Sequence, residues 1–319
     1  MSKTAQTPWH YGIIGAGPVG CIVAAFLAKA GHKVTLCDIV PELVDTARER
    51  GIIIEGAETL QQKVPHTCNR LDELIDAKPD IIFVCVKAQV LALIGSALGD
   101  LFQPGIHVVS WQNGIDTEFE LARSLGKKPV MRAVVNWGCG LLGPAHVTMP
   151  FHHPPHYIQE LDPNTKEVAA RLADILTECG LPTRHTDQIV PMVWRKTIMN
   201  ASMNPVCATT GLTMSQVMSD PIVFGVVDSL IKECLVVARA NEIHLGWDYY
   251  QNAIDYLNSA GGHKPSMLMD IEAKRRTEID YINGKIVEYG IKAGVSTPYN
   301  SLMRSVIKGI EFRLETEPR

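Results

Sequence analysis

Residues Tyr11–Gly20 read Y-G-I-I-G-A-G-P-V-G and decide the fold of the amino-terminal part of the chain. The apolar run Tyr11–Ile14 predicts a short strand, and Cys21–Ala30 predicts an apolar helix. A glycine-rich turn between a strand and a helix is typical of folds that bind a dinucleotide. The alternative is a glycine-rich turn that binds no ligand.

Each glycine of this G-x-G-x-x-G pattern has a physical task. Gly15 allows a tight turn, Gly17 lets a pyrophosphate approach the backbone, and Gly20 lets the helix pack closely on the strand. The free N–H groups at the start of the helix then bind the phosphates. The candidate cofactor-binding residues of the turn are Gly15, Ala16, Gly17, Pro18, Val19 and Gly20.

Asp38 indicates which dinucleotide binds. It follows a second predicted strand, Lys33–Cys37, at about the 20-residue spacing at which an acidic residue contacts the adenosine ribose. Its carboxylate would repel a 2′-phosphate, and the first arginine after it is Arg48. We therefore expect NAD(H) rather than NADP(H). Alternatively, Asp38 caps the next helix, which has Pro41 in its first turn.

Further buried strands alternate with helices in this half of the chain. The apolar runs Ile81–Val86, Val108–Trp111 and Val130–Asn136 predict a parallel, doubly wound sheet of the Rossmann type. Lys87 and Asn113 directly follow two of these strands, at the edge where ligands bind. Each could also be an ordinary loop residue.

The pattern changes near Asp187, after which only helices are predicted. We expect an α/β fold with a Rossmann-type dinucleotide-binding domain in residues 1–187 and an all-helical substrate and catalytic domain in residues 188–319. Met267–Gly294 is interpreted as one amphipathic helical stretch. The final helices are apolar enough to predict a homodimer through the helical domain.

The stretch Trp194–Asn204, W-R-K-T-I-M-N-A-S-M-N, predicts a helix with a polar face. Lys196, Asn200 and Asn204 recur every fourth residue and therefore share one side of the helix. An ammonium and two amides among apolar residues are typical of a site that binds a small polar ligand and donates a proton. The alternative is a solvated polar stripe.

Composition excludes several other classes of protein. The net charge of −4 argues against a nucleic-acid partner, and no apolar run approaches the length of a membrane span. The eight cysteines contain no C-x-x-C pair, and the first residues do not resemble a signal peptide, so we expect a cytoplasmic protein. The loop F-H-H-P-P-H, with His152, His153 and His156, lacks a known zinc spacing, and we expect no metal.

Taken together, the motifs resemble the ketopantoate reductases, which reduce 2-dehydropantoate to (R)-pantoate on the way to pantothenate and coenzyme A. The resemblance runs from Gly12 to Asn300 in the family's order. The motifs that carry it are GAGPVG, Lys87-Ala88-Gln89, Gln112-Asn113-Gly114, WRKTIMNASMNP, PSMLMD, Thr277–Gly284 (TEIDYING) and Gly294–Asn300 (GVSTPYN).

This resemblance implies roles for individual residues. It implies that Lys196 is the catalytic proton donor and that Glu278 is a second catalytic or substrate-positioning group. Substrate binding is implied for Asn113, Asn200, Asn204 and Ser266, and Asn113 and Lys87 are expected beside the nicotinamide and the cofactor or substrate.

The chain departs from the family at the cofactor. Familiar members use NADPH and carry a basic residue after the second strand, where this chain has Asp38. NADP(H) is thus expected from the resemblance and NAD(H) from Asp38. Two other functions stay open: an NAD-dependent dehydrogenase for another branched or aromatic 2-hydroxy acid, and a nicotinamide-dinucleotide-sensing protein without turnover.

Overall fold

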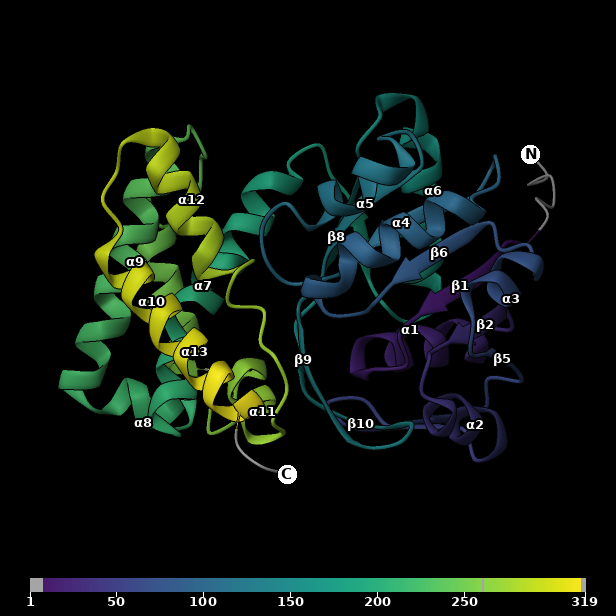
Figure 1. Ribbon diagram of the computed structural model, residues 1–319, viewed down its shortest axis with the longest axis horizontal. Coiled ribbons are helices and arrows are strands. Elements are labelled where there is room, and N and C mark those ends of the chain that lie inside the picture. The colour runs from purple at the N-terminus through teal and green to yellow at the C-terminus, as the bar shows by residue number, and fades with distance from the viewer. Residues whose placement is uncertain (1–7, 260, 317–319) are drawn as a thin grey trace. The chain divides into compact units, whose positions relative to one another are not determined.

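The computed structural model describes residues 8–259 and 261–316, which form two compact units (Figure 1). Unit 1 holds the chain up to Gln112 together with Thr117–Ile189. Unit 2 holds the short segment Asn113–Asp116 and the chain from Val190 onward. The sequence analysis places the division after residue 187. It did not predict that the segment Asn113–Asp116 belongs to the same unit as the carboxyl-terminal helices. Each unit is described on its own.

Unit 1 is built on an eight-stranded sheet in the order β12-β11-β8-β7-β6-β1-β2-β5. Every neighbouring pair is parallel except β8 and β11. The strands are β1 (His10–Ile14), β2 (Lys33–Cys37), β5 (His66–Cys68), β6 (Ile81–Val84), β7 (His107–Ser110), β8 (Val130–Val134), β11 (His156–Glu160) and β12 (Thr183–His185). Because the chain moves outward from β1 in both directions, the strand order confirms the predicted Rossmann-type sheet.

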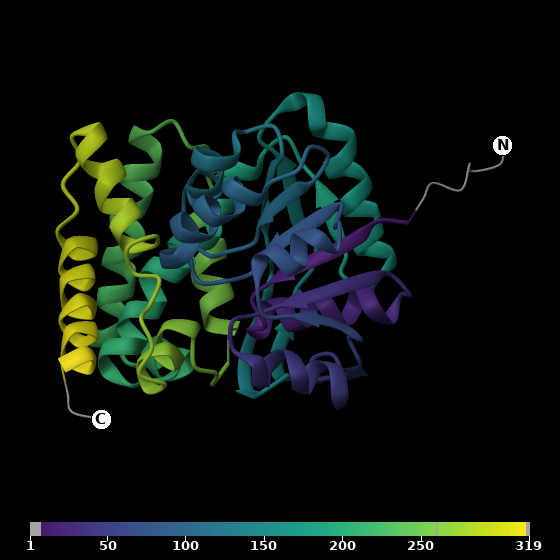
Figure 2. The ribbon, with the colours of Figure 1, turned by 45° about the vertical axis from the view of Figure 1, so that its right-hand side comes forward.

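Helices alternate with these strands, as Figure 2 shows from a second side. They are α1 (Pro18–Lys29), α2 (Pro41–Glu49), α3 (Leu71–Asp76), α4 (Leu91–Leu101), α5 (Thr117–Leu125) and α6 (Lys166–Glu178), with short 3₁₀ turns at Ala88–Val90 and Pro163–Thr165. The central strands are buried on both faces; Ile13, Leu36 and Phe83 are fully buried. Burial of that kind contributes about 1.5–3 kcal/mol for each large apolar side chain and explains the near-continuous apolar runs in the sequence.

A second, four-stranded sheet in unit 1 was not predicted. Its order is β4-β3-β10-β9, with β3 (Ile52–Gly56), β4 (Leu60–Gln62), β9 (Trp137–Gly143) and β10 (His146–His152). In β3 only Ile52 and Ile54 are buried, so one face of the strand lies on the core. The predicted histidine loop is correspondingly shorter, because His152 ends β10 and His156 begins β11.

Unit 2 contains only helices among its described residues, which confirms the predicted helical carboxyl-terminal part. They are α7 (Ile189–Thr210), α8 (Met214–Ser219), α9 (Pro221–Ala240), α10 (Tyr249–Ser259), α11 (Ser266–Glu272), α12 (Asn283–Ala293) and α13 (Pro298–Thr316). None of the described helices in either unit is both long and apolar enough to cross a membrane.

The prediction of one helical stretch over Met267–Gly294 is wrong. The chain leaves α11 through Lys274, which has a φ of 52°, and does not become helical again until Asn283. The backbone N–H and the hydroxyl of Thr277 both donate to Glu311 Oε1 at 2.7 Å, which satisfies groups that a helix would otherwise pair. Glu278 therefore lies on a turn rather than on a helix.

Candidate active site

The glycine-rich turn of unit 1 has the geometry that its sequence predicts. Gly15 has a φ of +102°, which favours glycine, and a Cβ added at Gly20 would lie 1.9 Å from the carbonyl oxygen of Gly15. A Cβ at Gly17 would meet nothing within 4 Å, so the backbone there is open on the side that a side chain would cover. Gly17 is also the residue that caps α1. The start of α1 thus offers an uncovered anion-binding turn.

Asp38 lies against this turn. Its Oδ2 accepts a hydrogen bond from the backbone N–H of Ala16 at 2.7 Å, and its Oδ1 accepts one from Val40 at 2.9 Å. The side chain therefore accepts a hydrogen bond from Val40, the residue before α2, and a second one from the glycine turn. A role as helix cap alone would not require the second bond. The structure thus places a carboxylate next to the open glycine turn, at the edge of the sheet where folds of this type bind dinucleotides.

Lys87 lies at the same edge of the sheet. It follows β6, and the N–H of Cys85 donates to the carbonyl of Ile14 at 2.8 Å, directly before the glycine turn. Lys87 is half-buried and begins the 3₁₀ turn Ala88–Val90. Unit 1 therefore brings the glycine turn, Asp38 and Lys87 to the carboxyl ends of β1, β2 and β6.

We expect the two glycines to respond differently to alanine. Gly20→Ala should lower the free energy of unfolding by about 3 kcal/mol, because the new Cβ overlaps the carbonyl of Gly15. Gly17→Ala, the matched control, should change stability by less than about 1 kcal/mol yet weaken NADH binding, because its Cβ fills the open side of the turn. Urea unfolding and NADH fluorescence measure both effects; equal stability losses would contradict the geometry.

Helix α7 of unit 2 carries the predicted polar face. Lys196 and Asn200 are half-buried, and Asn204 is only 4% exposed. The fully buried Ile198 and Met203 fix the helix against its neighbours. A freely solvated stripe does not fit these exposures.

The segment Asn113–Asp116 brings another predicted residue next to Glu278. Asn113 Nδ2 donates to Glu278 Oε2 at 3.4 Å, and the N–H of Ile115 donates to the carbonyl of Tyr281 at 3.0 Å. Gly114 is required here, because a Cβ would lie 2.6 Å from the same carbonyl oxygen. Two residues that are 165 positions apart in sequence thus become neighbours in unit 2.

The segment is held at its other end by Asp116. The carboxylate of Asp116 accepts hydrogen bonds from Tyr289 Oη at 3.0 and 3.2 Å and pairs with Lys285 Nζ at 3.1 Å. Ser266, the remaining predicted residue, is half-buried and is the first residue of α11. The structure thus pairs Asn113 with Glu278.

A buried polar network supports α7, and the sequence analysis did not identify it. Asn283 Nδ2 donates to the carbonyl of Ala201 in α7 and to Asn300 Oδ1, both at 2.9 Å. Asn300 donates to Glu233 Oε1 through its backbone N–H at 2.8 Å and its Nδ2 at 2.7 Å. Asn283 and Asn300 lie within the motifs quoted above, but a buried amide has no signature that separates it from a ligand-binding amide.

Replacing Asn300 by alanine should lower the free energy of unfolding by about 3 kcal/mol, because the buried Glu233 carboxylate and the Asn283 amide each lose a partner. Asn252→Ala, on the exposed face of α10, is the matched control and should have almost no effect. Denaturant unfolding measures both variants. If the free energy of unfolding of Asn300→Ala falls no more than that of the control, the network contributes nothing to stability.

The histidine cluster is a hydrogen-bonded chain. His156 Nδ1 accepts from the N–H of Asn136 at 3.0 Å, so a neutral His156 carries its proton on Nε2. That nitrogen lies 3.2 Å from His152 Nε2, and His152 Nδ1 lies 3.1 Å from Glu58 Oε1. Because the Nε2 of His156 is the donor, this pair does not offer two free lone pairs to a metal ion.

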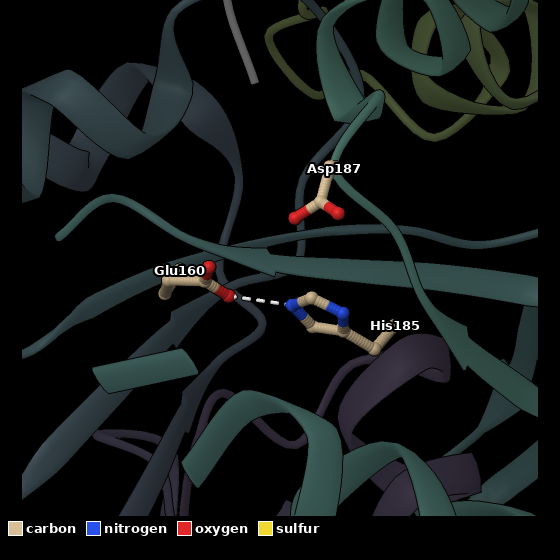
Figure 3. A group of neighbouring side chains, drawn as sticks. All are labelled: Glu160, His185 and Asp187. Atoms are coloured by element: carbon tan, nitrogen blue, oxygen red, sulfur yellow. Dashed lines mark hydrogen bonds and ion pairs between the residues drawn. The ribbon is translucent and has the colours of Figure 1, made fainter. Parts of the chain in front are cut away.

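A second cluster with ligand-like side chains lies at the ends of β11 and β12 and just after β12 (Figure 3). His185 Nε2 is 2.7 Å from Glu160 Oε2, and the potential ligand atoms of Glu160, His185 and Asp187 lie within 4.8 Å of one another. Both carboxylate oxygens of Asp187, however, already bind Lys166 Nζ, at 2.8 and 3.1 Å. That hydrogen bond lowers the pKa of Asp187, and within this cluster Asp187 is therefore partnered by Lys166 and Glu160 by His185.

Family models match the chain over both units. Residues 11–162 match the family model described as ketopantoate reductase PanE/ApbA, and residues 188–311 match the model of its C-terminal part. A 2-dehydropantoate 2-reductase of Streptococcus pyogenes serotype M3 is 26% identical over 309 residues, covering 96% of this chain and 99% of that protein.

Two solved structures are similar over almost the whole chain. A ternary structure of D-mandelate dehydrogenase with NADH and anilino(oxo)acetate has a TM-score of 0.86 and 28% identity, covering 96% of this chain and 100% of that one. A PanE/ApbA family ketopantoate reductase from Ralstonia eutropha JMP134 has a TM-score of 0.84 and 28% identity, covering 96% and 99%. With its Rossmann-type sheet, glycine turn and polar α7 face, the chain belongs to the ketopantoate reductase family of nicotinamide-dependent oxidoreductases.

Proposed function

We propose that this protein reduces a 2-keto acid to the corresponding 2-hydroxy acid, with 2-dehydropantoate as substrate and (R)-pantoate as product. The observation that carries the proposal is the polar face of α7, with Lys196, Asn200 and Asn204 at helical spacing in a family member. A sensor without turnover would need no proton donor at this position. The proposed reaction is the one named in the relatives' name, 2-dehydropantoate 2-reductase.

The residues of unit 2 have the chemistry that this reaction needs. A bound nicotinamide dinucleotide supplies the hydride. Lys196 donates a proton to the keto oxygen, whose negative charge develops as its carbon is reduced, and the C=O group becomes CH–OH. Asn200, Asn204 and Ser266 bind the carboxylate and hydroxyl groups without adding a charge that titrates.

Glu278 acts as the second catalytic or positioning group, and its neighbour Asn113 is suited to orienting it. Asn113 Nδ2 donates to Glu278 Oε2, and this hydrogen bond can orient the carboxylate for an interaction with Lys196 or a substrate hydroxyl. Asn113 and Lys87 are also assigned to the nicotinamide side of the site.

NADH is proposed as the preferred cofactor. The support is Asp38, whose carboxylate lies 2.7 Å from the amide of Ala16 in the glycine turn and would repel a 2′-phosphate. The D-mandelate dehydrogenase to which this chain is similar was solved with NADH.

A panel of 2-keto acids, assayed with NADH and with NADPH, tests the proposal. The panel contains 2-dehydropantoate, the aromatic benzoylformate and unbranched 2-keto acids, and the readout is the loss of reduced nicotinamide absorbance. We expect the highest kcat/KM for 2-dehydropantoate. Binding of NADH with no turnover of any keto acid would instead support a sensor.

An aromatic 2-hydroxy acid dehydrogenase is the second candidate. The similarity to D-mandelate dehydrogenase, with a TM-score of 0.86, favours it, and so does the NADH present in that structure. A higher kcat/KM for benzoylformate than for 2-dehydropantoate would decide for this candidate.

We also propose a cytoplasmic homodimer that assembles through unit 2. Of the apolar residues on and next to the last helices, Ile282, Ile286 and Ile307 are buried within the unit, whereas Ile291 is 74% and Leu302 58% exposed. The eight cysteines are all free thiols, as expected in a reducing compartment.

The expected mass in solution is that of two 35.1 kDa chains. Leu302→Glu should shift the equilibrium to monomer, because it places a charge on the exposed apolar face. Light scattering at micromolar concentration measures both proteins. A monomeric wild type would contradict the proposed assembly.

A further inference from the structure

Cys37 and Cys68 face each other at the carboxyl ends of two neighbouring parallel strands. The register of β2 and β5 pairs Cys37 directly with Cys68. Neighbouring strands lie about 4.8 Å apart, within the Cα separation of about 4.4–6.8 Å that a disulfide spans. The two thiols are close enough to share a hydrogen bond, Cys37 Sγ also donates to the carbonyl of Arg70 at 3.5 Å, and both thiols are free. The pair is thus close enough for a disulfide without a change of register.

The two thiols differ in reactivity. Cys37 is only 3% exposed, whereas Cys68 is half-buried on the edge strand of the sheet. The hydrogen bond from Cys37 lowers the pKa of Cys68, and the same hydrogen bond, followed by burial, raises the pKa of Cys37. Cys68 is therefore the thiol that ionises and reacts first.

The pair is coupled to the residue assigned to the ribose. Asp38 directly follows Cys37, and its backbone N–H donates to the carbonyl of Cys68 at 3.2 Å. Asn69, directly after Cys68, donates through Nδ2 to the carbonyl of Asp38 at 2.8 Å. A change in the distance between the two strand ends therefore moves the backbone that places the Asp38 carboxylate.

We propose that Cys37 and Cys68 are a redox modification site. A low-molecular-weight disulfide oxidises the two thiols to a reversible Cys37–Cys68 disulfide, which weakens cofactor binding. The proposal rests on the function assigned above, since it regulates the same cofactor site. The Cys68 thiolate attacks one sulfur of the small disulfide and releases one thiol. Cys37 then loses its proton, attacks Cys68 Sγ and releases the second thiol, so that one disulfide is reduced as another forms.

Bond formation brings the two sulfur atoms to about 2.05 Å and restricts the dihedral angles of both side chains. The backbone at the two strand ends adjusts to this geometry. Asp38 then loses its alignment with the glycine turn, to which it is joined through Ala16. We expect the Kd for NADH to rise about tenfold, the effect of losing one hydrogen bond to a charged group.

To test the proposal, the reduced protein is treated with 2-hydroxyethyl disulfide. Intact mass and peptide mapping under non-reducing conditions measure the bond, and NADH fluorescence titration measures Kd. We expect a linked peptide pair containing Cys37 and Cys68, a raised Kd, and recovery of both on addition of dithiothreitol. Cys68→Ser should bind NADH normally and lose the response.

Cys139→Ala is the matched control. Cys139 is also half-buried, and its replacement leaves Cys37 and Cys68 in place, so this variant should respond as the wild type does. No Cys37–Cys68 peptide, or an unchanged Kd once the bond has formed, would overturn the proposed site. A reduced protein that fails to bind NADH would instead overturn the cofactor assignment on which the proposal rests.

Discussion

Replacing Lys196 by alanine is expected to lower kcat and kcat/KM together by about 10²–10⁴, the contribution of a general acid that acts in the transition state. The Kd for NADH should hardly change, because the residues assigned to the cofactor's adenosine and phosphates belong to unit 1. Steady-state kinetics with 2-dehydropantoate and fluorescence titration with NADH measure the two effects separately.

Lys232→Ala is the matched control for this variant. Lys232 is also a lysine on a helix of unit 2, but it is exposed and paired with Asp228 at 2.7 Å. Its removal should leave kcat unchanged. Near-normal turnover by Lys196→Ala would remove the proton-donor assignment and return the polar face of α7 to a structural role.

Exchanging Asp38 for arginine should change cofactor preference by about 10², from NADH toward NADPH. The substitution removes the carboxylate that repels a 2′-phosphate and supplies a group that pairs with it. The ratio of kcat/KM for the two cofactors is the measurement. Glu42→Arg, an exposed position on α2 with the same change of charge, controls for the general electrostatic effect and should leave the ratio almost unchanged.

A wild-type preference for NADPH would contradict the assignment of Asp38 to the ribose. In that case the hydrogen bond from Ala16 to Asp38 would be a purely structural link between β2 and the glycine turn.

The sequence was sufficient to predict those parts of the fold whose chemistry is local. The glycine turn has few alternatives, because Gly20 must lack a Cβ for α1 to pack against Gly15. The polar face of α7 follows from helical periodicity alone. The doubly wound sheet follows from buried apolar strands that alternate with helices.

Features that depend on distant partners could not be predicted in this way. The non-helical segment after α11 is held by Thr277 binding Glu311, 34 residues away, and Glu278 follows directly on a turn. The proximity of Asn113 to Glu278 depends on the packing of Gly114 against Tyr281. The second sheet joins β3 to β10, which are about 90 residues apart, and neither strand has a strong pattern of its own.

Deuterium transfer tests the central claim most directly. Wild-type protein is incubated with 2-dehydropantoate and NADH labelled with deuterium at the transferred position of C4, and the product is analysed by mass spectrometry. The account predicts (R)-pantoate with one deuterium on C2 for each NADH oxidised, and formation of this product about 10²–10⁴ times more slowly in Lys196→Ala. NADH binding without labelled product from 2-dehydropantoate or any other 2-keto acid would contradict the account.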